Sequence, residues 1–164
     1  PKAGTFVMVV DMLKGVLAVR LAYLAPYYLD PEHLTQLVNL QIGLGLAAVV
    51  GHIFPIYANF KGGKGIATLF GLVLAIQPLV ALCCVGVFLM ILFLTRYVSL
   101  SSIIASIAFP ILILYIFNEP EIFYRIFAIA VALMVVLTHQ KNITRLLKGV
   151  ESKVPLFKNK KDKN

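Results

Sequence analysis

Six apolar segments follow one another along this chain of 164 residues, and most of them reach the length that crosses a lipid bilayer, about 20 residues. They cover residues 4–29, 34–54, 66–77, 79–95, 98–117 and 122–138. Hydrophobic residues make up 60% of the chain and charged residues 13%, and the mean hydropathy is +0.93. A soluble domain of this size cannot hide so much apolar surface. The sequence therefore predicts an all-α, polytopic integral membrane bundle with six spans.

The third apolar segment, residues 66–77, is too short to cross about 30 Å of hydrocarbon. Pro78 follows it directly, and proline ends or kinks a helix because it lacks the N–H group and restricts the residue before it. A short helix of this kind often ends inside the protein, where it lines a polar cavity. We therefore expect a short third span that is broken at Pro78.

Positive charge alternates along the connections between the apolar segments. Lys61 and Lys64 follow the second segment and Arg96 follows the fourth, whereas the connections at 30–33 and 119–121 carry neither lysine nor arginine. The positive-inside rule places the basic connections in the cytoplasm. The sequence therefore predicts a multi-pass protein whose C-terminus is cytoplasmic.

The net charge of +8 lies mostly after the last apolar segment. We predict a membrane-embedded domain over residues 1–150, followed by a basic, disordered cytoplasmic tail over residues 151–164. A basic tail beside a bilayer indicates anionic membrane lipid as a partner. Nucleic acid is not expected as a partner, because Phe157 is the only aromatic residue in the tail.

Two adjacent cysteines, Cys83 and Cys84, lie within an apolar run. Neighbouring cysteines rarely form a disulfide, and no metal-ligand spacing accompanies them. We expect both to pack in the core, and we expect neither a metal nor a cofactor.

A glycine- and lysine-rich loop, residues 61–65, stands directly before the third apolar segment. Glycine lets backbone N–H groups approach an anion, a helix start adds unpaired N–H donors, and lysine supplies a compact charge. The loop predicts a phosphate site with these substrate-binding candidates: Lys61, Gly62, Gly63, Lys64, Gly65 and Thr68. Alternatively, the lysines only mark the cytoplasmic side and the glycines are ordinary loop residues.

Two further polar features lie near this loop in the predicted bundle. His52 precedes the loop and could act as a general acid or base, or could hold the loop through a hydrogen bond to a carbonyl group. Asp11 and Lys14 share one face of the first helix, where they form either a buried ion pair or one wall of a polar cavity.

Three serines, Ser99, Ser101 and Ser102, lie at the start of the fifth segment. Serine at a helix start is by default a cap, and here it could also contact an oxyanion. No His–Asp pair accompanies these serines, so the sequence does not indicate a nucleophile of the triad kind.

An amphipathic segment, residues 139–151, leaves the last span and is predicted to end its helix at Gly149. One interpretation is an interfacial helix that turns its basic residues, among them Arg145, toward lipid headgroups. In the other interpretation His139 and Asn142 turn toward the inner loops and complete a polar pocket.

Several motifs of this chain resemble those of the bacterial acyl-phosphate:glycerol-3-phosphate acyltransferases, the PlsY family. They are Asp11-x-x-Lys14-Gly15, Gly51-His52-x-Phe54-Pro55, residues 60–68, Arg96-Tyr97-Val98-Ser99-Leu100 and His139-x-x-Asn142-Ile143-x-Arg145-Leu146. The resemblance implies a seven-helix enzyme of the bacterial inner membrane that serves phospholipid synthesis. It would move a fatty acyl group from acyl-phosphate to the 1-hydroxyl of glycerol 3-phosphate, giving lysophosphatidic acid and phosphate.

The resemblance also assigns roles to single residues. Lys64 is the main cation of a phosphate-holding loop, His139 and Asn142 are catalytic positions, and His52 supports the site. Ser99, Ser101 and Arg145 join the substrate-binding candidates. The implied partners are glycerol 3-phosphate, acyl-phosphate and an upstream enzyme that forms the acyl-phosphate.

One departure from the family pattern concerns the N-terminal side. The family's first helix and its Ser-Gly-Asn-rich motif have no counterpart here, and six spans remain in place of seven. We expect an N-terminally truncated fragment that is inactive alone. Gln140 also stands where many relatives carry arginine.

The chemistry that the resemblance implies is consistent with these residues. An acyl-phosphate is an activated anhydride, so an enzyme needs mainly to neutralise phosphates, orient the hydroxyl and exclude water. A substrate phosphate oxygen or His139 would take the hydroxyl proton. The alternative function is a transporter or channel subunit for a phosphorylated anion, since transporters also use broken helices.

Overall fold

The computed structural model describes residues 2–26, 30–60 and 62–155, and the regular secondary structure in these residues is entirely helical. The α-helices are α1 (Lys2–Arg20), α2 (Leu34–Ile53), α3 (Ile66–Ile76), α4 (Pro78–Thr95), α5 (Val98–Ile111), α6 (Ile122–Thr138) and α7 (Gln140–Leu147). The first six helices fall within the six apolar segments apart from one or two residues at their starts. The all-α prediction is confirmed.

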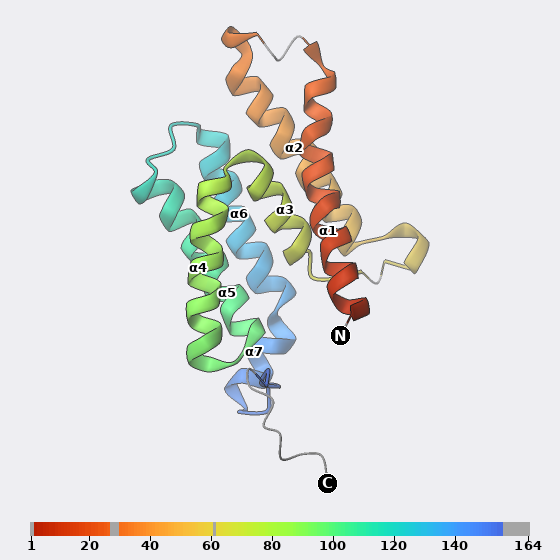
Figure 1. The fold of residues 1–164 in the computed structure, drawn as a ribbon, viewed down its shortest axis with the longest axis vertical. Coiled ribbons are helices and arrows are strands. Elements are labelled where there is room, and N and C mark those ends of the chain that lie inside the picture. Colours follow the sequence, from red (N-terminus) through yellow and green to blue (C-terminus); the bar gives the residue numbers. More distant parts are fainter. Residues whose placement is uncertain (1, 27–29, 61, 156–164) are drawn as a thin grey trace.

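The helices run up and down, so that their connections alternate between the two ends of the bundle (Figure 1). The end of α1, the start of α2, and the turns that join α3 to α4 and α5 to α6 lie at the upper end in that view. The loop before α3, the α4–α5 turn and α7 lie at the lower end. Three segments that are far apart in sequence therefore meet at this lower end.

Helix α3 lies between α1 and α4, and glycines let α1 approach it closely. A Cβ atom on Gly15 would lie 2.1 Å from the carbonyl oxygen of Thr68, and one on Gly71 would lie 2.1 Å from that of Met12. Small residues of this kind permit close backbone packing between membrane helices. Any side chain at either position would push α1 away from α3.

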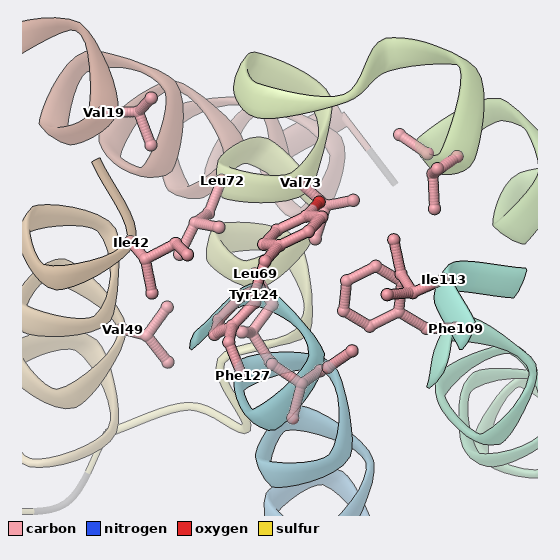
Figure 2. Packing of buried hydrophobic residues seen from close by; sticks show 14 of the residues in the cluster. Val19, Ile42, Val49, Leu69, Leu72, Val73, Phe109, Ile113, Tyr124 and Phe127 are labelled. Carbon is pink, nitrogen blue, oxygen red and sulfur yellow. The ribbon is translucent and has the colours of Figure 1, made fainter. Parts of the chain in front are cut away.

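The core of the bundle is formed around three aromatic rings from α5 and α6 (Figure 2). Tyr124 and Phe127 stack with their centroids 5.7 Å apart, and Phe109 meets both rings edge-on. Such offset and edge-on pairs stabilise beyond the area that they bury. Aliphatic side chains of the other helices surround the rings: Val19, Ile42, Val49, Leu69, Leu72, Val73 and Ile113.

Two helix ends differ from the prediction. The first apolar segment was predicted to run from residue 4 to residue 29, but α1 ends at Arg20 and continues as the 3₁₀ turn Leu21–Leu24. The fifth segment changes from α5 into the π-turn Leu112–Ile116. Pro110 explains this second change, because it has no N–H group to donate within the helix.

In the part of the chain that the structure describes, three helical stretches are long and apolar enough to cross a membrane: Leu34–Ala58, Pro78–Thr95 and Val98–Ile116. A fourth results if α6 and α7, which meet at 61°, are counted as one bent span. Helix α3 has 11 residues, about 16 Å at 1.5 Å per residue, and it ends just before Pro78, as the sequence indicated. The count of six spans stays a prediction.

Candidate functional site

Five side chains form one hydrogen-bonded group at the lower end of the bundle. Lys64 Nζ donates to Asn142 Oδ1 at 2.6 Å, and Asn142 Nδ2 donates to Glu151 Oε1 at 2.7 Å. Ser99 Oγ donates to the same Glu151 oxygen at 2.6 Å, and Arg145 Nε donates to Oε2 at 2.6 Å. We call these five residues the Lys64 cluster.

Glu151 reaches this group because the chain reverses after α7. Gly149 has a φ of +70°, a left-handed conformation that suits glycine, and its N–H donates to the carbonyl of Leu146. Further on, Val154 N donates to the carbonyl of Arg96 at 2.9 Å. The segment after α7 is thereby fixed against the start of α5, and the side chain of Glu151 is only 6% exposed.

Glu151 was not among the site residues predicted from the sequence, where it stands at the start of the predicted basic tail. One signal was available. Gly149 was correctly expected to end α7, and an acidic residue two positions after a helix-ending glycine can fold back onto that helix. The sequence pattern did not reveal the partner Ser99, because that residue lies 52 residues away from Glu151.

The glycines before α3 are required by packing and by backbone conformation. A Cβ atom on Gly62 would lie 2.0 Å from the carbonyl oxygen of His52, and one on Gly63 would lie 2.3 Å from His52 Nε2. Gly65 precedes α3 with a φ of +78°. These contacts argue against the interpretation of the glycines as ordinary loop residues. Lys61 lies outside the described residues.

His52 contacts α1 as well as the loop. Its Nδ1 lies 3.4 Å from Asp11 Oδ1, and the same oxygen accepts a hydrogen bond from Lys14 Nζ at 2.9 Å. Asp11 and Lys14 thus form the ion pair of the first interpretation, although the Lys14 side chain is 50% exposed and the pair is not buried as expected. A hydrogen bond from His52 to a carbonyl group, one of the two alternatives for this residue, is not found among the described residues.

His139 forms the hinge between α6 and α7 and is 2% exposed. Its Nδ1 lies 2.8 Å from the carbonyl oxygen of Val135, an acceptor, so Nδ1 carries the proton. In the neutral ring Nε2 is then an acceptor. The ring is anchored to α6, while α7 carries Asn142 into the Lys64 cluster.

Two of the nominated hydroxyl groups do not join the cluster. Thr68 is fully buried where α3 crosses α1, and its Oγ1 has no hydrogen-bond partner within the described residues. Ser101 is also fully buried and donates to the carbonyl of Tyr97. The default expectation of serine caps is wrong, because α5 starts at Val98 without a side-chain cap.

Two pKa shifts describe the electrostatics of the cluster. Burial lowers the pKa of Lys64 below its usual value. Hydrogen bonds from Arg145, Ser99 and Asn142 lower the pKa of Glu151 to about 2. At neutral pH Glu151 is therefore ionised and compensates one of the two cationic side chains, and the cluster retains one positive charge that can attract an anion.

The apolar helices and this basic polar site at one end define a polytopic membrane protein with a site at the membrane boundary. The chain belongs to the glycerol-3-phosphate acyltransferase family, whose family model matches residues 1–149. This confirms the family resemblance that the motifs indicated. The protein is a multi-pass membrane acyltransferase of that family.

Individual relatives that match this chain are glycerol-3-phosphate acyltransferases by name. The chain is 35% identical to "Glycerol-3-phosphate acyltransferase" of Chlorobium limicola over 96% of its own length and 77% of the relative. It is 42% identical to the protein of that name from Prochlorococcus marinus (strain MIT 9215), over 91% of this chain and 71% of the relative.

Two solved structures are similar to the whole bundle. Both are crystal structures of PlsY, described as an integral membrane glycerol 3-phosphate acyltransferase. The glycerol 3-phosphate form has a TM-score of 0.78 at 33% identity, and the lysophosphatidic acid form has 0.77 at 34%. Each similarity covers 93% of this chain and 72% of the other chain.

Proposed function

We propose that this protein moves a fatty acyl group from an acyl-phosphate to the 1-hydroxyl of glycerol 3-phosphate and releases lysophosphatidic acid and inorganic phosphate. The observation that carries the proposal is the Lys64 cluster, which gathers a cation, hydroxyl and amide groups from three distant motifs. The two ligand forms of the PlsY structures support this acceptor and this product. The acyl-phosphate donor rests on the family resemblance.

The loop before α3 is suited to hold a phosphate dianion. The N–H of Gly62 donates to Ile53, but the N–H groups of Gly63, Lys64 and Gly65 make no hydrogen bond within the described residues. Unpaired N–H groups at a helix start, next to an ammonium group, form an anion site. We assign Lys64 as the main cation and Asn142 as the residue that orients it.

The reaction needs no covalent enzyme intermediate. The 1-hydroxyl oxygen attacks the carbonyl carbon of the acyl-phosphate, a new C–O bond forms, and the bond to the phosphate oxygen breaks. Lys64 and the loop N–H groups stabilise the charge on the phosphate groups while the two substrates are held in place. We assign the hydroxyl proton to a phosphate oxygen of the substrate, since burial of His139 leaves it little access to substrate.

The proposed location is the bacterial inner membrane, with the Lys64 cluster and the C-terminus on the cytosolic side. The described connections that carry Lys64 and Arg96 lie at one end together with α7 and the segment after it, which supports this orientation. An enzyme that forms the acyl-phosphate would supply the donor from the same side, and the product would enter phospholipid synthesis.

The deciding experiment measures lysophosphatidic acid formed from labelled glycerol 3-phosphate and acyl-phosphate by the full-length protein in proteoliposomes. Lys64→Ala should lower kcat/KM by about 100-fold or more, the range seen when one donor to a developing charge is removed. Glycerol 3-phosphate uptake without product would overturn the proposal in favour of transport. A burst of phosphate without glycerol 3-phosphate would replace direct attack by an acyl-enzyme.

A further inference from the structure

A polar connection links α1 to the phosphate-binding loop through one imidazole ring. The ring of His52 lies between the Asp11 carboxylate, 3.4 Å from its Nδ1, and the backbone of Gly63 near its Nε2. Asp11 makes no hydrogen bond or ion pair with the loop among the described residues. The polar path from Asp11 to the described part of the loop therefore runs through His52.

Burial of the Asp11 carboxylate has a high desolvation free energy. This indicates a role for Asp11 beyond an ion pair with Lys14. Asp11 is only 9% exposed, and a carboxylate buried in this way needs polar partners to compensate the loss of water. Lys14 supplies one partner, but the Lys14 side chain is 50% exposed, so that pair faces outward. The other partner, His52, faces the loop.

We propose that Asp11 is a positioning residue for the phosphate-binding loop and acts through His52. This inference rests on the proposed function of the loop. The carboxylate holds the ring with Nδ1 toward α1, and this fixes the ring edge that packs against Gly63. Nε2 makes no hydrogen bond within the described residues, so this nitrogen can form one with a ligand held at the loop.

The arrangement explains why residue 63 has no side chain. A Cβ atom there would lie 2.3 Å from Nε2 and 3.1 Å from Cε1, so the ring and a larger residue cannot share the space. If the His52 ring rotated away from Asp11, its Nε2 and Cε1 atoms would no longer pack against Gly63 in the same way, and the loop backbone could shift. The position of the Gly63 and Lys64 N–H groups thus depends on Asp11.

The test is a double-mutant cycle on the full-length protein with Asp11→Asn, His52→Gln and the double variant. We expect Asp11→Asn to raise KM for glycerol 3-phosphate about tenfold with kcat within about threefold, since loss of binding common to ground and transition states raises KM alone. Asp11→Asn should then add nothing in the His52→Gln background, because interacting sites are not additive. Independent effects that multiply would overturn the inference.

Lys14→Gln is the matched control, since it removes the other partner of the same carboxylate oxygen. It should change KM less than twofold, and a tenfold rise that persists in the His52→Gln background would overturn the inference in favour of a general role of α1. The thermal unfolding temperature of each variant is measured in parallel. An Asp11→Asn variant that unfolds earlier but keeps the wild-type KM would also overturn it.

Lys64→Ala separates the inference from the function on which it rests. If Lys64→Ala leaves KM and kcat unchanged, the loop does not hold substrate and both proposals fail. If Lys64→Ala is impaired while Asp11→Asn retains the wild-type KM, only the role of Asp11 fails.

Discussion

The two sides of the Lys64 cluster are held in place by different forces. On the loop side, Gly62 and Gly63 pack against the end of α2 so tightly that there is no room for a methyl group. On the C-terminal side, one carboxylate accepts three hydrogen bonds, from Ser99, Asn142 and Arg145. The first side depends on shape and the second on charge.

This difference predicts different sensitivities of the two sides. Close packing responds to added volume and hardly to pH or salt. A charge-assisted hydrogen-bond network is weakened by loss of the charge and by acid, even when the volume of the side chain stays the same. The comparison is therefore tested by substitutions that add volume without changing charge, and by substitutions that remove charge without changing volume.

The largest effect is expected from Gly62→Ala on the loop side. The new Cβ atom would lie 2.0 Å from the His52 carbonyl oxygen and 2.6 Å from that of Ile53, and these backbone atoms cannot turn aside. The loop must shift, and a misplacement of about 1 Å can cost about 100-fold in rate. We expect kcat/KM for acyl transfer to fall by about that factor.

Gly86→Ala is the control for that substitution. Gly86 lies in α4, and a Cβ atom on it would meet nothing within 4 Å. Alanine replaces glycine in a helix with a gain of up to about 1 kcal/mol. Activity should stay at the wild-type level, and an equal loss in both variants would show that the loop has no special steric requirement.

A smaller effect is expected from Glu151→Gln on the C-terminal side. The amide keeps the shape and one acceptor, but it loses the charge that pairs with Arg145 at 2.6 Å. We expect KM for glycerol 3-phosphate to rise about tenfold, which corresponds to about 1.4 kcal/mol. Glu32→Gln, at the opposite end of the bundle, changes an exposed carboxylate and should leave KM unchanged.

The helices were predicted well because apolar segments bounded by charged residues and prolines leave few alternatives. The breaks around Pro78 and after Gly149 were found for the same local reason. Local pattern failed where a hydrogen-bond register changed inside a continuous apolar run, as at Pro110, and where α1 gave way to a 3₁₀ turn after Arg20.

The residues of the Lys64 cluster were predicted only in part from the sequence. Residue type indicates what chemistry a side chain can perform, but it does not show which way that side chain faces. Lys64, Asn142 and Ser99 were nominated from separate motifs, and they meet in the structure. Ser101 and Thr68 have the same chemistry but are fully buried by helix packing. The hydrogen bond from Ser99 to Glu151 and the contact between Asp11 and His52 join residues that are far apart in sequence, and no local pattern encodes them.

Acid should weaken the C-terminal side before the loop side. Hydrogen bonds from Arg145, Ser99 and Asn142 hold the pKa of Glu151 at about 2, below the ordinary value of 4.5. A carboxylate whose pKa is lower in the folded state stabilises the fold at pH values above its ordinary pKa. This stabilisation is lost as the pH falls from about 4.5 toward 2. The thermal unfolding temperature of the wild type, measured between pH 6 and pH 3, should approach that of Glu151→Gln. A constant gap between the two would contradict the role of the charge.

The smallest effect concerns Lys64, which links the two sides through Asn142. Burial lowers the pKa of Lys64, so the ammonium group loses its proton at a lower pH than an ordinary lysine and phosphate binding weakens as pH rises. Lys64→Arg keeps its charge at every accessible pH, although it loses the compact fit to Asn142. KM for glycerol 3-phosphate, measured from pH 7 to pH 10, should rise on the alkaline side in the wild type and stay flat in Lys64→Arg. Parallel alkaline profiles would assign the titration to the substrate or to another group, and the charge at residue 64 would then not be what binds the phosphate.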